Sequence, residues 1–144
     1  MPKTASFVAF GLMVVGLAGL FYNGGLFARR PAVIAVQVAA ALLMVAARIT
    51  FGARSFHATA NPTAGGVVST GPYAYLRHPI YAAAIYLTWA GTLDHFSWVN
   101  VGWAGLVTAG GFVRMLLEER MLVERYPEYR AYMARVRRMV PFVF

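Results

Sequence analysis

The 144-residue chain contains no cysteine. Disulfide bridges, thiol redox chemistry and metal sites with cysteine ligands are therefore excluded, as is any membrane enzyme that works by shuttling a disulfide. Only five residues are acidic, and all but one of the thirteen basic residues are arginine. The histidines do not stand at metal-ligand spacing with any partner, so no metal site is predicted.

Charge of either sign is scarce. Charged residues make up 12% of the chain, against about 25% in an ordinary soluble domain. Hydrophobic residues make up 60%, and the mean hydropathy is +0.59. This composition predicts an integral membrane protein, and the length allows one compact domain. No cleavable signal peptide is evident, because the first apolar run is too long and ends without a small-residue cleavage site.

The net charge of +8 indicates an anionic partner. The basic residues cluster beside apolar runs, which favours the headgroups of anionic lipids. No basic groove on a soluble scaffold is visible, so nucleic-acid binding is not predicted.

The apolar residues form four runs that we interpret as transmembrane helices. They cover residues 5–28, 32–52, 79–93 and 96–113, and the last continues through residues 115–117. The first run is long enough to cross about 30 Å of hydrocarbon, and its glycines allow a neighbouring helix to approach closely. The sequence therefore predicts an all-α, polytopic membrane bundle of about four transmembrane helices.

We expect a single membrane domain over residues 1–144. Residues 1–52 would form a two-helix N-terminal hairpin, and residues 53–144 would form the functional core. The C-terminal tail is amphipathic: Pro127 suits the first position of a helix, and one helical face carries Tyr129, Tyr132, Met133 and Val136. An interfacial helix on the membrane surface is predicted from this pattern.

The distribution of lysine and arginine predicts the orientation. Basic residues at the N-terminus, in the long loop after the second run and in the tail fall on one side of a four-span bundle. Only Arg29 and Arg30 fall on the other side. Both termini are therefore expected to be cytoplasmic, in the cytoplasmic membrane of a bacterium or archaeon.

Two charged patches interrupt the apolar pattern. The first lies in residues 71–81, and the second comprises Arg114, Glu118 and Glu119. A short hairpin between the third and fourth runs would bring both to the cytoplasmic face. Ionisable groups beside hydrocarbon cost free energy unless they bind a ligand or a partner group. Taken singly, each patch has a plainer interpretation, an interfacial anchor for the first and a solvated helix end for the second.

The chemistry of the two patches is complementary. Pro79 suits the first helical position, so His78 is expected to cap the third run, where free backbone N–H groups favour an anion. Arg114 and Glu118 are spaced i and i+4 and can pair. Glu119 points about 100° away, and its carboxylate can hold an ammonium group or ribose hydroxyls. S-adenosylmethionine carries charges of both signs and a ribose diol, and methyl transfer from it needs positioning rather than a metal or a triad.

Several motifs support this interpretation by their order and spacing. They are Phe51-Gly52-x-x-Ser55-Phe56, Gly71-Pro72-Tyr73-x-Tyr75-x-Arg77-His78-Pro79-x-Tyr81, Glu118-Glu119-x-x-Leu122, Tyr126-x-x-Tyr129-x-x-Tyr132 and Arg138-x-x-Pro141-Phe142. Over about residues 51–144 this pattern resembles the isoprenylcysteine carboxyl methyltransferase family of small membrane methyltransferases, whose wider group includes phospholipid N-methyltransferases. One departure is Ala83, which stands where that family usually has glycine.

The resemblance implies a membrane helix bundle whose C-terminal half encloses the cofactor at the cytoplasmic face. It implies that His78, Pro79 and Tyr81 contact S-adenosylmethionine, with S-adenosylhomocysteine as the product. Tyr75 is expected to form a wall of the same pocket.

The resemblance also implies roles for the second patch. Glu118 and Glu119 would contact the cofactor or order the site, and Glu119 is our first choice. The arginine that lies near the methyl acceptor in the family falls on Arg114. Arg114 and Glu119 are therefore the predicted catalytic residues.

The methyl acceptor stays open. A membrane lipid or another lipophilic small molecule is expected to enter sideways from the bilayer. Arg114 would suit a carboxylate, which favours carboxyl O-methylation of an isoprenylcysteine-like acceptor, and the alternative is N-methylation of a phospholipid or another lipid amine.

The alternatives of another class are a small transporter, a membrane reductase and a non-catalytic membrane protein. The first three runs lack the acidic residue that a proton-coupled exporter needs. The chain also lacks a dinucleotide-type glycine loop.

Overall fold

The computed structural model describes residues 2–52 and 66–144, and all regular elements in these ranges are helices. They are α1 (Pro2–Tyr22), α2 (Pro31–Phe51), the short 3-10 helix η2 (Gly71–Ala74), α3 (Pro79–Asp94), α4 (Trp98–Arg125) and α5 (Tyr129–Arg135). Within the described ranges the one extended pairing is an isolated bridge between Leu76 and Arg137. The prediction of an all-α fold is confirmed.

The first helix ends earlier than the apolar run predicts. α1 stops at Tyr22, although the uncharged run continues to residue 28. Gly24 adopts a φ of 68°, and the N–H of Gly25 donates to the carbonyl of Leu20 at 2.8 Å. This left-handed turn is a common way to end a helix at glycine. The remaining apolar residues therefore form a loop that leads to α2.

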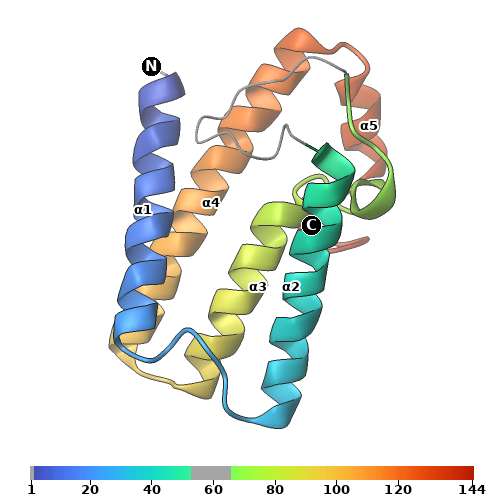
Figure 1. Cartoon of the computed structure of the whole chain (residues 1–144). Helices are drawn as coiled ribbons and strands as arrows, with labels where there is room; N and C mark the ends of the chain where they lie inside the picture. Colours follow the sequence, from blue (N-terminus) through green and yellow to red (C-terminus); the bar gives the residue numbers. More distant parts are fainter. Residues whose placement is uncertain (1, 53–65) are drawn as a thin grey trace.

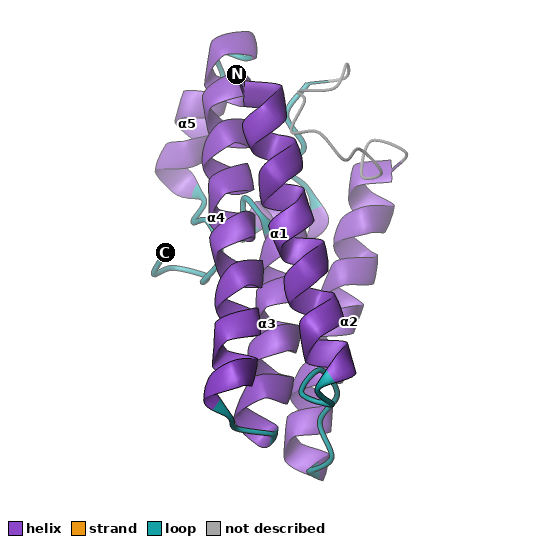
Figure 2. Cartoon of the chain, turned by 90° about the vertical axis from the view of Figure 1, so that its left-hand side faces the viewer, coloured by secondary structure: helices purple, strands orange, loops and turns teal. Residues whose placement is uncertain are grey.

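The long helices pack in pairs. α1 lies along α4, and α2 lies along α3, while α3 and α4 form an antiparallel hairpin (Figures 1 and 2). Both N-terminal helices thus pack on the C-terminal part of the chain. The boundary predicted at residue 52 stays a prediction, and the packing connects the two parts closely.

Glycines allow the close approach of α1 and α4. A Cβ added at Gly16 would lie 2.7 Å from the backbone oxygen of Trp103, and one added at Gly19 would overlap the indole ring of the same residue. Likewise, a Cβ on Gly110 would collide with the backbone oxygen of Ala9. The close helix contact expected from small residues is confirmed at these positions.

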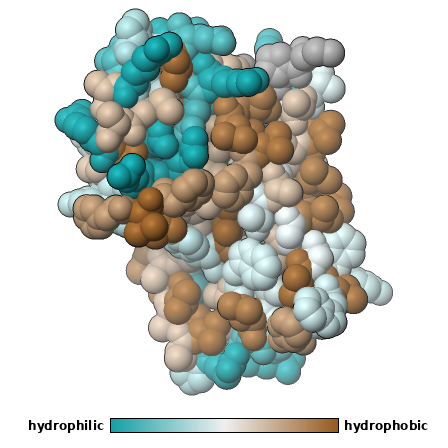
Figure 3. All heavy atoms as spheres, turned by 180° about the vertical axis from the view of Figure 1, so that it is seen from behind, coloured by the Kyte–Doolittle hydropathy of each residue, from teal (hydrophilic) through white to brown (hydrophobic). Residues whose placement is uncertain are grey.

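Two helices, α1 and α2, are long and apolar enough to cross a membrane. Most of the residues in them are not buried inside the protein, as expected for lipid-facing helices and unlike the core helix of a soluble domain. Figure 3 shows the larger group of hydrophilic side chains at the upper end of this face, a smaller group at the lower end, and mostly hydrophobic to neutral side chains between them. α3 has only 16 residues and α4 carries several charges, so four membrane spans stay a prediction.

Asp94 lies at the C-terminus of α3, at the end of the bundle remote from the candidate site, and bonds there to the α1–α2 loop. Its carboxylate accepts hydrogen bonds from the backbone N–H of Arg29 at 2.5 Å and of Arg30 at 3.2 Å, and also from the guanidinium of Arg30. This contact ties the α1–α2 loop to the hairpin of α3 and α4.

The amphipathic tail helix differs from its prediction. α5 begins at Tyr129 rather than Pro127 and has seven residues. Tyr129, Tyr132 and Val136 are buried against the end of α4 and neighbouring residues, and the Tyr132 hydroxyl donates to the carbonyl of Tyr73 at 2.6 Å. The apolar face assigned to the membrane surface is therefore covered by the protein itself, and that part of the prediction is wrong.

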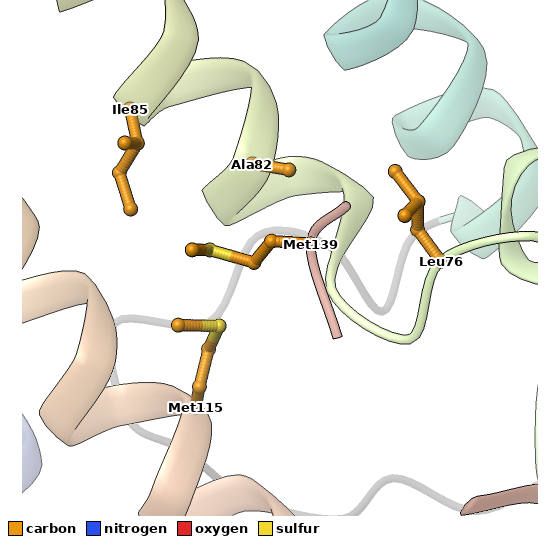
Figure 4. Packing of buried hydrophobic residues seen from close by; sticks show 5 residues of the cluster. All are labelled: Leu76, Ala82, Ile85, Met115 and Met139. Atoms are coloured by element: carbon orange, nitrogen blue, oxygen red, sulfur yellow. The ribbon is translucent and has the colours of Figure 1, made fainter. Parts of the chain in front are cut away.

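A compact cluster of apolar side chains fixes the base of the candidate site. Leu76 precedes α3, Ala82 and Ile85 lie on α3, Met115 lies on α4, and Met139 comes from the C-terminal segment, residues 136–144 (Figure 4). These side chains hold the start of α3, the middle of α4 and the C-terminal segment together. The polar groups described next are attached to these same elements.

Candidate functional site

The start of α3 lies beside the C-terminal segment. The backbone N–H of Arg77 donates to the carbonyl of Arg137 at 2.7 Å, and that of His78 donates to the carbonyl of Arg138 at 3.0 Å. His78 is the residue that precedes Pro79 at the first helical position, as predicted. The His78 amide is thus paired within the protein, while its ring projects toward α4.

Glu119 is the centre of one charged cluster. Its carboxylate accepts hydrogen bonds from Nε and Nη2 of Arg138 at 3.2 and 3.0 Å, and it lies 3.1 Å from Nε2 of His78. Nη2 of Arg77 lies 3.4 Å from the same carboxylate. Glu119 and His78 are buried and the Arg77 side chain is 9% exposed, so the charges are compensated where water is largely excluded.

This end of α4 carries Glu118, Glu119, Arg120, Glu124 and Arg125 in a short stretch, and so many charges are rare inside the hydrocarbon of a bilayer. Burial by itself would raise the pKa of the Glu119 carboxyl. The hydrogen bonds from His78 and Arg138 outweigh that effect and lower the pKa from 4.5 to about 2. Glu119 is therefore ionised at neutral pH.

A second cluster joins Tyr81, Glu118 and Arg114. The Tyr81 hydroxyl donates to Oε1 of Glu118 at 2.5 Å and accepts from Nε of Arg114 at 2.8 Å. Nη2 of Arg114 lies 3.8 Å from Glu118, as the i,i+4 spacing predicts, and Nη1 lies 3.3 Å from Oγ of Ser6 in α1.

The two clusters meet at His78. Its Nε2 contacts Glu119, and its Nδ1 lies 3.8 Å from Oε2 of Glu118. The imidazole therefore stands between the two carboxylates. The patches predicted from the sequence to converge do so, through α3 and α4.

A match to a family model covers residues 32–129, and the model describes phospholipid methyltransferases. The chain belongs to the phospholipid methyltransferase family. The family indicates a methyltransferase, and families of this kind normally use S-adenosylmethionine. No curated protein and no solved structure matches the chain.

This family and the isoprenylcysteine carboxyl methyltransferases belong to one superfamily of integral-membrane methyltransferases. The resemblance drawn from the motifs is therefore confirmed at the level of the superfamily. The narrower identification with the carboxyl methyltransferases is not supported by the match.

The family match contains every residue predicted for the site, and the structure brings most of them together. Tyr75 is the exception, since it is 63% exposed and does not touch the two charged clusters. Pro79 is buried and supplies the helix start rather than a polar contact.

Three further residues reach the charged clusters. Arg77 belongs to the first patch, Arg138 belongs to the Arg-x-x-Pro-Phe motif, and Ser6 lies in the first helix. Arg138 and Ser6 fall outside the family match. The motif could have drawn attention to Arg138, whereas no local pattern distinguishes Ser6.

Proposed function

We propose that the chain transfers a methyl group from S-adenosylmethionine to the amine of a membrane lipid. The observation that carries the proposal is the juxtaposition of Glu118 and Glu119 around His78, within a chain of the phospholipid methyltransferase family. The acceptor named first from the sequence, an isoprenylcysteine-like carboxylate, becomes the alternative.

The donor set fits the charges of the proposed cofactor. Carboxylates suit its ammonium and sulfonium groups and its ribose hydroxyls, and Glu118 and Glu119 provide them. Arginine suits its carboxylate, and Arg77 and Arg138 lie beside Glu119. Cofactor binding would exchange the Glu119–Arg138 pair for two pairs with the ligand, so that no buried charge loses its partner.

S-adenosylmethionine supplies a methyl carbon that its positively charged sulfur makes electrophilic. The residues of the chain must then present the acceptor nitrogen with a free lone pair. A lipid amine is protonated at neutral pH, so it must first lose a proton. We assign Glu118 as the base that accepts this proton. Its side chain is 26% exposed and is oriented by the Tyr81 hydroxyl.

In this scheme Arg114 is a positioning residue. Its guanidinium is buried and already bonded to Tyr81 and Ser6, which leaves it little capacity for an acceptor carboxylate. The same guanidinium lies 5.3 Å from the ring centre of Phe10. The preference for a carboxylate acceptor rested on Arg114, and these contacts favour the lipid amine instead.

The proposal extends to the location of the reaction. The charged end of α4 and the hydrophilic region of Figure 3 suggest a site at the membrane surface. The excess of arginine near that end favours the cytoplasmic side. The acceptor would reach it from the bilayer without leaving the lipid phase.

Isothermal titration with S-adenosylhomocysteine tests the cofactor assignment. Glu118→Gln should weaken binding by about tenfold, since one hydrogen bond to a charged group contributes about 1.5–3 kcal/mol. Glu128→Gln is the matched control, because Glu128 is exposed and makes no side-chain cap. Absence of binding to the wild-type protein up to millimolar ligand would refute the methyltransferase proposal.

Transfer of a radiolabelled methyl group to a native lipid extract tests the acceptor. Label in the amine headgroup of a lipid supports the proposed reaction. Label that is released by mild base as a methyl ester would instead establish carboxyl methylation and reject the amine.

A further inference from the structure

A groove runs along the outer side of α4 where α5 packs beside it, with a volume of about 690 Å³. Val113, Leu116 and Leu117 form its apolar floor towards the middle of α4. Val113 and Leu116 are 40% and 49% exposed, so this floor faces the surroundings of the protein. The volume is in the range of sites for organic ligands, about 300–1,000 Å³.

The other end of the groove is charged. Glu119, Arg120 and Glu124 of α4 and Arg130 of α5 line it, which gives two groups of each sign. Within residues 2–52 and 66–144, Arg120, Glu124 and Arg130 make no ion pair or side-chain hydrogen bond. Three charged groups around one groove are thus available to a ligand.

The sequence of α4 places apolar side chains and then charged side chains along one stripe, that is, one face of the helix. Val113, Leu117, Arg120 and Glu124 are spaced by three or four residues and share a helical face with Leu116. From the first to the last the stripe extends about 16 Å at 1.5 Å per residue. An apolar segment followed by charges of both signs matches the order of acyl chain and headgroup in a phospholipid.

We propose that this groove binds the methyl acceptor, a glycerophospholipid whose headgroup carries both a phosphate and an amine. In the docked lipid the phosphate would lie against Arg120 and Arg130, and the amine against Glu124 and Glu119. For transfer the amine would pass Glu119 to reach Glu118, the carboxylate that accepts its proton. Arg120 and Glu124 are one helical turn apart, with Cβ atoms about 5–6 Å from each other, a separation that suits a short zwitterionic headgroup. The assignment rests on the proposed function, for which it supplies the acceptor site.

The lining favours a lipid over the cofactor. None of the groove residues in the described part of the chain is aromatic, so nothing there offers a ring to stack on adenine. The groove nevertheless reaches the reaction cluster, because Glu119 lines it and also contacts His78. One side chain therefore borders both the acceptor groove and the proposed cofactor site.

The test measures lipid binding and cofactor binding separately on the full chain in nanodiscs. Phosphatidylethanolamine is the probe, and phosphatidylglycerol, which has the phosphate but no amine, is the comparison lipid. Retention of each lipid is measured by native mass spectrometry, and S-adenosylhomocysteine binding by calorimetry. The first variant is Arg130→Glu, with Arg135→Glu on the exposed end of α5 as its control. The second is Leu116→Trp, with Val99→Trp, another exposed position of α4, as its control.

We expect Arg130→Glu and Leu116→Trp each to weaken phosphatidylethanolamine retention by about tenfold or more, while the affinity for S-adenosylhomocysteine stays within about twofold of wild type. The two control variants should retain both ligands. Equal retention of the two lipids by the wild-type protein, or a loss of cofactor rather than lipid in the groove variants, would overturn the acceptor groove. Failure of the wild-type protein to bind S-adenosylhomocysteine would instead reject the proposed function.

Discussion

Replacement of Glu119 by alanine should destabilise the protein strongly. The carboxylate accepts two hydrogen bonds from Arg138, contacts His78 and pairs with Arg77. Its removal leaves the Arg77 side chain, which is 9% exposed, without its carboxylate partner, and leaves the buried His78 with Glu118 alone at 3.8 Å. Removing one partner of a buried ion pair costs about 3–5 kcal/mol.

Thermal unfolding in detergent micelles, followed by circular dichroism, measures this loss. In a chain of this size the melting temperature should fall by roughly 10–15 °C. Glu128→Ala removes an exposed carboxylate from the same region and should change stability by less than about 0.5 kcal/mol. Equal melting temperatures for the two variants would show that the cluster around Glu119 does not hold the fold together.

The same carboxylate should impose a pH dependence on stability. Burial opposes ionisation of Glu119, but the hydrogen bonds from His78 and Arg138 lower its pKa from 4.5 to about 2. A depressed folded-state pKa means that the contribution is complete above pH 4.5 and is lost as the pH falls toward about 2. Glu119→Gln should flatten this part of the acid limb of the stability curve, and an unchanged limb would contradict the assignment.

Four further substitutions test the packing. Gly19→Ala should lower the melting temperature, because the new Cβ would overlap an indole ring of α4, whereas Gly11→Ala meets no atom within 4 Å and should stabilise α1 by about 0.5–1 kcal/mol. Asp94→Ala should release the α1–α2 loop and lower stability while S-adenosylhomocysteine affinity in calorimetry stays unchanged, since Asp94 lies at the end of the bundle remote from the candidate site. Tyr132→Phe loses the hydrogen bond to the Tyr73 carbonyl and should cost about 1 kcal/mol in chemical unfolding, and a neutral effect would argue against this docking of α5.

Local patterns in the sequence predicted the helices and part of the site. Apolar runs indicated α1 to α4, although α1 ends before its run does and α4 continues beyond its run to Arg125. The proline after His78 indicated the start of α3. The i,i+4 spacing of Arg114 and Glu118 predicted their proximity. Each of these features depends on residues within one or two helical turns, which is why the sequence alone was sufficient.

Contacts between distant segments could not be predicted in this way. Ser6 meets Arg114, and Arg138 meets Glu119, only because α1 and the C-terminal segment pack on α4. The apolar face of α5 shows the same limit. The pattern of apolar residues predicts that this face is buried, but it does not show what covers the face. The end of α4 covers it, where the sequence had predicted the membrane.

The pairing of α1 with α4 affects how the chain is made. The contact between Ser6 and Arg114 spans 108 residues, and a ribosome that adds about 5–20 residues per second needs roughly 5–20 s to synthesise that length. During that time α1, a candidate membrane span, lacks α4 as the partner of its glycine face. The length and apolar composition of α1 are sufficient for a membrane span that does not depend on α4. The contact between Ser6 and Arg114 can therefore form only after α4 has been synthesised, long after α1 itself.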